Sequence, residues 1–328
     1  MCRPAEPGYR KGRMLAQHDV SLRYSSRTVL LVDDSELVRS SLAAFIGGHP
    51  GMVVSARAAS ARAAIELAEA MHPDIALLDM NMPGGGARAA TGIHAVWPRT
   101  RMLAFTVRRD EQSVIAMLRA GVSGYLLKGT RPQKILTGIE HVLKGRAVLS
   151  PELGRHVAHR LDVITERAPV SRDFERDPVL VLAVDDDPGL LDAVDALIGG
   201  ESGIRLVGTA TNVDDAIELA STTHPDVALI DVRMPDWGGE RVAFEIARVA
   251  PATRMIAFSA SDDAGEVAAM LRGGASGYIV KGWGSQDLTD NIQSCARGHV
   301  VLDIGADALR DLVMTPHFET RAAYADAA

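Results

Sequence analysis

The sequence predicts two α/β domains, each with a parallel sheet covered by helices on both faces. The first observation is an internal repeat, in which HPDIALLDMNMP of the first half matches HPDVALIDVRMP of the second. The second is the alternation, in each half, of short Val-, Ile- and Leu-rich runs with longer segments of helical periodicity. The third is the length of 328 residues, which suits about two domains with a core each. The repeat is too long for a solenoid unit, so the chain is a domain duplication.

The repeat also shows which positions of the two halves correspond. Asp79 pairs with Asp231 at an offset of 152 residues, whereas Lys128 pairs with Lys281 at an offset of 153. One residue has therefore been inserted into the second copy, near Trp237.

Five strand–helix units are expected in each copy. In the first copy the apolar runs predict strands near residues 28–32, 52–56, 75–78, 102–105 and 124–127. The segment between the second and third strands predicts a helix, with Ala64, Leu67 and Met71 on one apolar face. The same order of elements is predicted for the second copy.

Polar side chains follow the predicted strands of both copies at the points where the strands end. They are Asp33, Asp34, Asp79, Thr106 and Lys128, and at matching positions Asp185, Asp186, Asp231, Ser259 and Lys281. A single Asp, Thr or Lys at such a point is usually a helix cap, a turn residue or a solvated side chain. Five matching positions in two copies favour a ligand site instead, because the carboxyl ends of parallel strands meet at one edge of the sheet.

The chemistry of these side chains indicates a divalent cation and phosphoryl transfer. Three carboxylates in one pocket repel one another unless a hard cation neutralises them, and Mg²⁺ prefers oxygen ligands. A carboxylate in that setting can attack phosphorus, while a lysine and a hydroxyl stabilise the charge of the transferring group. The sequence therefore predicts one such site in each half.

Both halves resemble the receiver domains of two-component response regulators over nearly the whole length of each repeat. The segments GYLLKG, GYIVKG and VLSPELGRHVAHRL resemble most the NarL/FixJ-type receivers, which precede a helix-turn-helix. The resemblance implies a CheY-like, flavodoxin-like doubly wound (βα)5 fold in each half, with a five-stranded parallel sheet in the order 2-1-3-4-5.

The resemblance also implies a role for each site residue. It makes Asp79 and Asp231 the phosphoacceptors. The other ligands it implies for Mg²⁺ are Asp33, Asp34, Asp185 and Asp186, with the backbone carbonyls of Asn81 and Arg233. In the first copy it makes Thr106 the switch hydroxyl, Lys128 the pairing lysine and Tyr125 the switch aromatic. In the second copy Ser259, Lys281 and Tyr278 have these roles.

By the same resemblance, the phosphoryl group comes from a sensor histidine kinase, a phosphotransfer protein or a small phosphodonor. Slow self-hydrolysis then resets the domain, so no separate enzymatic activity is expected. The phosphoryl group shifts the face made by helix 4, strand 5 and helix 5, which is also a surface for dimerisation.

The expected domain organisation follows from the repeat and from composition. It comprises a disordered tail at 1–27, a receiver at 28–145, a linker with one helix at 146–178, a receiver at 179–298 and a linker-like helix with a tail at 299–328. In the first linker Ser150 is predicted to cap the helix and Pro151 to begin it, while Leu153, Val157 and Leu161 form its apolar stripe.

Composition excludes several other classes of protein. No stretch approaches the roughly 20 uninterrupted apolar residues of a membrane span, and the first residues lack the apolar core of a secretory signal. The chain has a net charge of −7, whereas a nucleic-acid-binding domain is typically rich in positive charge. Cys2 and Cys295 have no partner at a metal-like or disulfide-like spacing. We therefore expect a cytoplasmic protein without direct contact to nucleic acid or membrane.

Three functional hypotheses remain open from the sequence. The first is a signalling protein that acts through contacts with a downstream protein or as a phosphate sink. The second is a DNA-binding transcriptional regulator whose output domain is truncated or supplied by a partner. The third is a phosphatase with an aspartyl nucleophile, like the haloacid-dehalogenase enzymes; those place the nucleophile after the first strand in a DxD pattern, whereas Asp79 and Asp231 follow the third.

Overall fold

Two parallel six-stranded sheets form the framework of the chain, in the orders β2-β1-β3-β4-β5-β6 and β12-β11-β10-β9-β7-β8. The computed structural model describes residues 26–161, 172–174, 177–200, 203–234, 238–282 and 285–314. The residues outside these ranges include nearly all of the predicted N-terminal tail with Cys2, much of 162–176, Trp237 at the predicted insertion, and the predicted C-terminal tail.

The first half, residues 26–161, alternates strands and helices as expected. Its elements are β1 (Arg27–Val32), α1 (Glu36–Gly47), β2 (Met52–Ala58), α2 (Ala61–Met71), β3 (Ile75–Leu78), α3 (Gly86–Val96), β4 (Arg101–Thr106), α4 (Glu111–Arg119), β5 (Gly124–Leu127), α5 (Pro132–Leu143), β6 (Val148–Leu149), a 3₁₀ turn (Pro151–Leu153) and α6 (Gly154–Arg160).

The second half, residues 177–314, repeats this order up to its last helix. Its elements are β7 (Val179–Val184), α7 (Pro188–Ile198), β8 (Ile204–Ala210), α8 (Val213–Thr223), β9 (Val227–Asp231), α9 (Gly238–Val249), β10 (Arg254–Ser259), α10 (Ala264–Arg272), β11 (Gly277–Val280), α11 (Ser285–Ala296), β12 (Val301–Asp303) and α12 (Ala306–Met314).

The order 2-1-3-4-5 predicted for each sheet is confirmed, and each sheet has one strand more than predicted. In each half a sixth, short strand adds to the edge: β6 runs parallel to β5, and β12 runs parallel to β11. Both strands fall in segments that were expected to be linkers. The linker-like segments therefore extend the two sheets.

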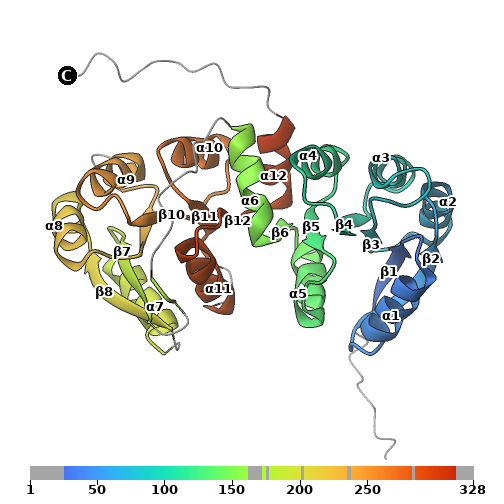
Figure 1. Ribbon diagram of the computed structural model, residues 1–328, viewed down its shortest axis with the longest axis horizontal. Coiled ribbons are helices and arrows are strands. Elements are labelled where there is room, and N and C mark those ends of the chain that lie inside the picture. Colours follow the sequence, from blue (N-terminus) through green and yellow to red (C-terminus); the bar gives the residue numbers. More distant parts are fainter. Residues whose placement is uncertain are drawn as a thin grey trace, which may run out of the picture.

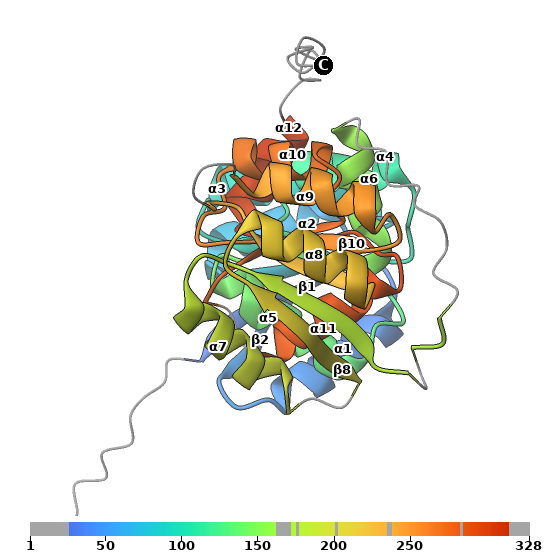
Figure 2. The same ribbon diagram turned by 90° about the vertical axis from the view of Figure 1, so that its left-hand side faces the viewer.

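The strands are apolar on both faces because helices cover both faces. Val29 and Leu31 pack in one core with residues of α1 and α5, whereas Leu30 and Val32 pack in another with residues of α2, α3 and α4. Figure 2 shows the same layering in the second half, where α8, α9 and α10 lie on one side of the strands and α7 and α11 on the other.

Two details of the predicted helices are wrong. Met71 was expected on the buried face of α2, but it is 47% exposed, and the short side chains of Ala61, Ala64 and Ala68 form that face. Ser150 does not cap the helix that follows it; its hydroxyl accepts a hydrogen bond from the backbone N–H of Leu127 over 3.2 Å. Ser150 therefore ties the segment after β6 to the end of β5.

The two halves pack against each other through their edge strands and the helices beside them (Figure 1). The backbone N–H of Ala147 donates to the carbonyl of Ile304 over 2.7 Å, and that of Ala306 donates to Gly145 over 2.9 Å. Above the strands α12 contacts both α4 and α10, and α6 contacts α4 and α12.

One apolar core continues across this contact. It includes buried residues of α4, α6, α10 and α12, among them Val114, Val157, Val267 and Leu309. The predicted apolar stripe of the first linker helix is confirmed, since Leu153, Val157 and Leu161 are all buried. Of the helix 4, strand 5, helix 5 face, which the resemblance offers for dimerisation, α4 is thus covered by α6 and α12, and β5 pairs with β6.

A histidine at this contact gives a testable dependence on pH. Burial and the Arg146 guanidinium lower the pKa of His141, with a smaller effect of Lys144, against the opposing effects of Asp287 and Asp303. The unfolded chain has the ordinary histidine pKa of 6.5, so below pH 6.5 it binds more protons than the folded chain does. The contribution of His141 to the free energy of unfolding is therefore fully present above pH 6.5 and is lost as the pH falls below it.

We expect the free energy of unfolding to fall by up to about 1.4 kcal/mol per pH unit below the ordinary histidine pKa. Urea denaturation at about pH 7.5 and about pH 5.5, on the wild type and on His141→Gln, measures this effect. A loss of stability that is equal in both proteins would contradict the role of His141.

None of the described helices combines the length with the apolar composition that a membrane span requires.

Candidate functional site

The carboxyl ends of the first and third strands bring three carboxylates together in the first half. Val32 at the end of β1 and Leu78 at the end of β3 pair in register, so Asp33 and Asp79 leave the sheet side by side. The backbone N–H of Asp79 donates to the carbonyl of Val32 over 2.7 Å. Carboxylate oxygens of Asp33, Asp34 and Asp79 all lie within 4.8 Å of one another. Asp33 and Asp79 are buried, and Asp34 is exposed.

A lysine from the fifth strand lies against this triad. The Nζ of Lys128, directly after β5, is 2.6 Å from Oδ2 of Asp33 and 3.3 Å from Oδ2 of Asp79. Burial alone would lower the pKa of Lys128, but the two carboxylates outweigh it and raise that pKa above its ordinary value. The lysine is therefore an ammonium at neutral pH.

The second half repeats this arrangement. Carboxylate oxygens of Asp185, Asp186 and Asp231 lie within 4.8 Å of one another, again with the middle residue exposed. Lys281 Nζ is 2.7 Å from Oδ2 of Asp185 and 2.6 Å from Oδ1 of Asp231. The carboxylates outweigh burial here too, so the pKa of Lys281 is raised. The structure thus brings together the acids and the lysine that the sequence predicted for each half.

The residues of each triad fit a hard divalent cation. Three carboxylates and one ammonium leave two negative charges uncompensated in a partly buried site. In addition, Oδ1 of Asp79 is buried and has no hydrogen-bond partner among the described residues, although a buried polar atom normally has at least one. Oxygen ligands of this kind suit Mg²⁺.

The predicted switch hydroxyls lie at the ends of the fourth strands. Thr106 and Ser259 are fully buried. Each hydroxyl accepts a hydrogen bond from the backbone N–H two residues further on, over 3.4 Å from Arg108 and over 3.2 Å from Ser261. The hydroxyls are therefore attached to the loops that lead into α4 and α10.

The predicted switch tyrosines are buried and bond to the same two loops. Tyr125 donates its hydroxyl to the carbonyl of Arg108 over 3.1 Å, and Tyr278 donates to the carbonyl of Ser261 over 2.8 Å. Burial raises the pKa of Tyr278 to about 12 and that of Tyr125 further, so both remain phenols that can donate. Each tyrosine thus contacts the loop that its neighbouring hydroxyl contacts.

The residues two positions beyond the acceptors contact the same side of the sites. Asn81 Oδ1 accepts a hydrogen bond from Nε of Arg108 over 3.2 Å, and Nη2 of Arg233 pairs with Oε1 of Glu266 over 3.0 Å. A guanidinium therefore lies beside both acceptor loops, although the sequence places an arginine at this position only in the second. That the backbone carbonyls of Asn81 and Arg233 bind metal stays a prediction.

Sequence reasoning missed a pair of glycines that pack against the acceptors. A Cβ atom on Gly86 would lie 2.7 Å from the carbonyl oxygen of Asp79, and one on Gly239 would lie 2.4 Å from that of Asp231. Both distances are too short for a side chain. The two glycines occupy matching positions at the offset of 153, so a comparison of the two copies of the repeat could have identified them.

We expect Gly239→Ala to destabilise the chain by about 1–3 kcal/mol, because the added methyl group must displace the backbone of the acceptor loop. Urea denaturation measures this, and Gly200→Ala is the matched control, since a Cβ atom there meets nothing within 4 Å. Equal free energies of unfolding of the two variants would show that the acceptor loop accommodates the added methyl group without loss of stability.

The comparisons with known proteins agree with this geometry. The sequence model of the response regulator receiver domain matches residues 29–140 and again residues 181–293, which is more than half of the chain. The nitrate/nitrite response regulator protein NarL of Escherichia coli (strain K12) is 33% identical over 150 residues, covering 45% of this chain and 68% of that protein. Response regulator GacA of Pseudomonas viridiflava is 30% identical over 131 residues, covering 40% of this chain and 61% of that protein.

Two solved structures of similar proteins each match about two fifths of this chain. A two-component response regulator of the LuxR family from Aurantimonas sp. SI85-9A1 is 34% identical, with a TM-score of 0.39, covering 41% of this chain and 97% of that one. The signal receiver domain of a response regulator NarL from Mycobacterium tuberculosis is 31% identical, with a TM-score of 0.36, covering 37% and 98%. Since the receiver model matches both copies of the repeat, and each copy carries an acidic triad, the chain belongs to the response regulator receiver family, with two receiver domains in tandem.

Proposed function

We propose that Asp79 and Asp231 each accept a phosphoryl group from the phosphohistidine of a sensor histidine kinase or a phosphotransfer protein, or from a small phosphodonor. The chain then serves in a cytoplasmic phosphorelay, through contacts with a downstream protein or as a phosphate sink. One observation supports this most strongly: in each receiver a buried acceptor carboxylate lies within ion-pair distance of a lysine and is flanked by two further acids.

In the proposed reaction an oxygen of Asp79 attacks phosphorus. An O–P bond forms as the P–N bond of the phosphohistidine breaks, and the electron pair leaves on the imidazole nitrogen. The Lys128 ammonium, already paired with Asp79, then pairs with the phosphoryl oxygens, and the Thr106 hydroxyl moves to donate to them. Asp33, Asp34 and Asp79 would hold Mg²⁺, which would neutralise part of the charge on the transferring group.

The second receiver has the same parts. We assign the nucleophile to Asp231, the ammonium to Lys281 and the hydroxyl to Ser259, with Asp185 and Asp186 as the further metal ligands. In both receivers we assign the carbonyls of Asn81 and Arg233 to the metal and the switch role to Tyr125 and Tyr278. The phosphoryl group is lost again by slow hydrolysis, and no other substrate is assigned.

A second candidate function is regulation of transcription. A relative from Bacillus subtilis (strain 168), 36% identical over 121 residues, is described as an uncharacterized transcriptional regulatory protein. This candidate needs a DNA-binding domain, from a partner or from a longer chain. Specific retardation of DNA by the purified protein, under conditions in which it accepts phosphate, would favour it over the first.

Incubation with acetyl phosphate and Mg²⁺, followed by the mass of the intact protein, tests the proposed function. We expect two added phosphoryl groups on the wild type, one on Asp79→Asn and on Asp231→Asn, and none on the double variant. Asp192→Asn, which changes an exposed acid of α7, is the matched control and should still take two. Phosphoryl groups that remain on the double variant would refute the assignment of the acceptors.

A further inference from the structure

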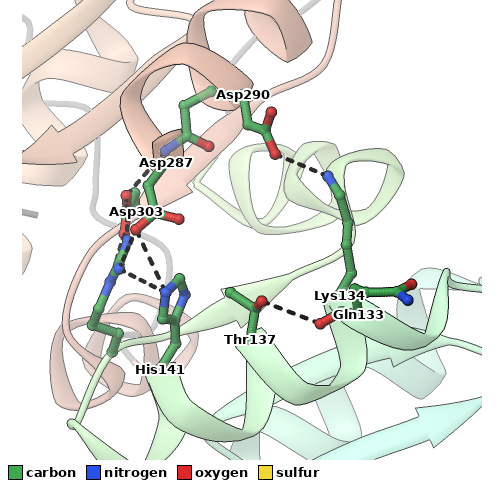
Figure 3. Close-up of polar contacts among 9 residues, drawn as sticks. Gln133, Lys134, Thr137, His141, Asp287, Asp290 and Asp303 are labelled. Carbon is green, nitrogen blue, oxygen red and sulfur yellow. Dashed lines mark hydrogen bonds and ion pairs between the residues drawn. The ribbon is translucent and has the colours of Figure 1, made fainter. Parts of the chain in front are cut away.

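The helices α5 and α11 face each other below the edge strands through polar side chains (Figure 3). At the exposed rim Lys134 of α5 pairs with Asp290 of α11 over 3.1 Å. Further in, Arg146 lies two residues before the start of β6, and its side chain is only 5% exposed. Its Nη2 lies 2.5 Å and 2.6 Å from the two carboxylate oxygens of Asp303, which ends β12.

Arg146 is the centre of this contact. Besides Asp303, its guanidinium donates from Nη1 to Oδ2 of Asp287 over 2.7 Å and lies 3.0 Å from Nε2 of His141. Asn291 donates to the second oxygen of Asp303 over 3.0 Å. A buried ion pair is tolerated when its geometry is good and its remaining polar atoms are satisfied, and this one meets both conditions.

The charges are separated by receiver. The first receiver contributes the cations Lys134 and Arg146, whereas the second contributes the three carboxylates of Asp287, Asp290 and Asp303. These positions have diverged between the copies of the repeat. At the offset of 153, Lys134 corresponds to Asp287, Arg146 to His299 and Ser150 to Asp303.

The divergence has a consequence for pairing between identical receivers. Had the first receiver packed on a copy of itself in this way, Arg146 would meet Lys134 in place of Asp287 and Ser150 in place of Asp303. Its charge would then be buried without a carboxylate. Had the second receiver packed on itself, Asp303 would meet His299 in place of Arg146. In the first case the buried guanidinium would lose both carboxylates. In the second the Asp303 carboxylate would face an imidazole in place of the permanently charged guanidinium, so both pairings would be less favourable than the observed one.

We propose that the α5 face of the first receiver and the α11 face of the second form a surface specific for unlike receivers. Its occupant is the other receiver of the same chain, and it rejects a second copy of the same receiver. The surface therefore holds the chain as an internal pair and is closed to dimerisation through like faces. The inference rests on the contacts between the receivers and is independent of the phosphoryl chemistry.

Cross-linking the full chain tests which faces meet. A carbodiimide joins a lysine to a carboxylate that it touches, and the side chains of Lys134 and Asp290 are exposed enough to react, at 59% and 46%. The reaction is run on an equal mixture of ¹⁴N- and ¹⁵N-labelled protein. We expect Lys134–Asp290 links whose two peptides carry the same isotope. Links of mixed isotope, or no such link, would overturn the proposal.

Exchanging the charges of Lys134 and Asp290 tests whether the cross-link depends on the attraction between these two side chains. Lys134→Asp should abolish it, and Lys134→Asp combined with Asp290→Lys should restore it between the exchanged side chains. Failure of the exchanged chain to form the link, while it keeps the wild-type circular dichroism spectrum, would also overturn the proposal.

The buried part of the surface is tested by giving the second receiver the residues of the first. In Asp287→Lys with Asp303→Ser, we expect the amides of Ala147 and Ala306 to exchange with solvent at least tenfold faster, because both bond across the contact. The amide of Asp79, inside the first sheet, is the internal reference, and Asp192→Lys on exposed α7 is the control for added charge. Unchanged exchange at Ala147 and Ala306 would show that like charges do not open the contact.

Discussion

Replacement of Arg146 by alanine is expected to lower the free energy of unfolding by about 3–5 kcal/mol. The substitution leaves the carboxylate of Asp303, whose side chain is 7% exposed, buried without the guanidinium that pairs with it. Burial already raises the pKa of Asp303 against the opposing effect of Arg146. Urea denaturation at neutral pH measures the loss, which should shrink as the pH falls and the stranded carboxylate takes up a proton.

The matched control is Lys134→Ala, because the Lys134–Asp290 pair belongs to the same contact but is exposed. An exposed pair contributes at most about 1 kcal/mol. Replacing both partners of the buried pair, as Arg146→Leu with Asp303→Leu, should cost less than Arg146→Ala alone, since no charge is left unpaired. Equal effects of Arg146→Ala and Lys134→Ala would mean that the buried contact does not hold the receivers together.

Removal of Mg²⁺ by EDTA is expected to slow the phosphorylation of both acceptors by at least about 100-fold. Each site carries two uncompensated negative charges, and the incoming phosphoryl group is negative as well. The lysine alone cannot neutralise them, because its ammonium is already paired with the carboxylates. The rate of label uptake from acetyl phosphate, in Asp79→Asn for the second site and in Asp231→Asn for the first, measures the effect at each site separately.

Adding Mg²⁺ in excess over EDTA is the control and should restore the rate at both sites. A rate that EDTA leaves unchanged at either acceptor would show that phosphorylation of that receiver does not depend on the metal.

Much of the fold and most of the site could be predicted because the relevant signals are local and repeated. Short apolar runs predicted the positions of the central strands. In a parallel sheet the residues that follow adjacent strands must lie at the same edge. Asp33 and Asp79 are 46 residues apart in the chain, yet they leave the sheet side by side for this reason. The same reasoning placed Lys128 against both of them.

The features that sequence reasoning missed depend on few residues or on distant partners. The strand β6 has only two residues, too few to show a periodic pattern, and it forms because β5 offers a free edge. Ser150 was expected to cap a helix, but the amide of Leu127 at that edge competes for its hydroxyl. The pairing of Arg146 with Asp303 joins residues 157 positions apart, and nothing near either of them in the sequence indicates it.

A titration with Mn²⁺ tests whether each receiver gathers its three acids around one divalent ion. Mn²⁺ accepts the same carboxylate, carbonyl and water ligands as Mg²⁺, and its free form is measured by electron paramagnetic resonance. We expect two ions bound per wild-type chain and displaced by Mg²⁺, one in Asp34→Asn, and none in Asp34→Asn with Asp186→Asn. Two ions still bound to the double variant, or no saturable binding by the wild type, would show that the acidic triads are not metal sites.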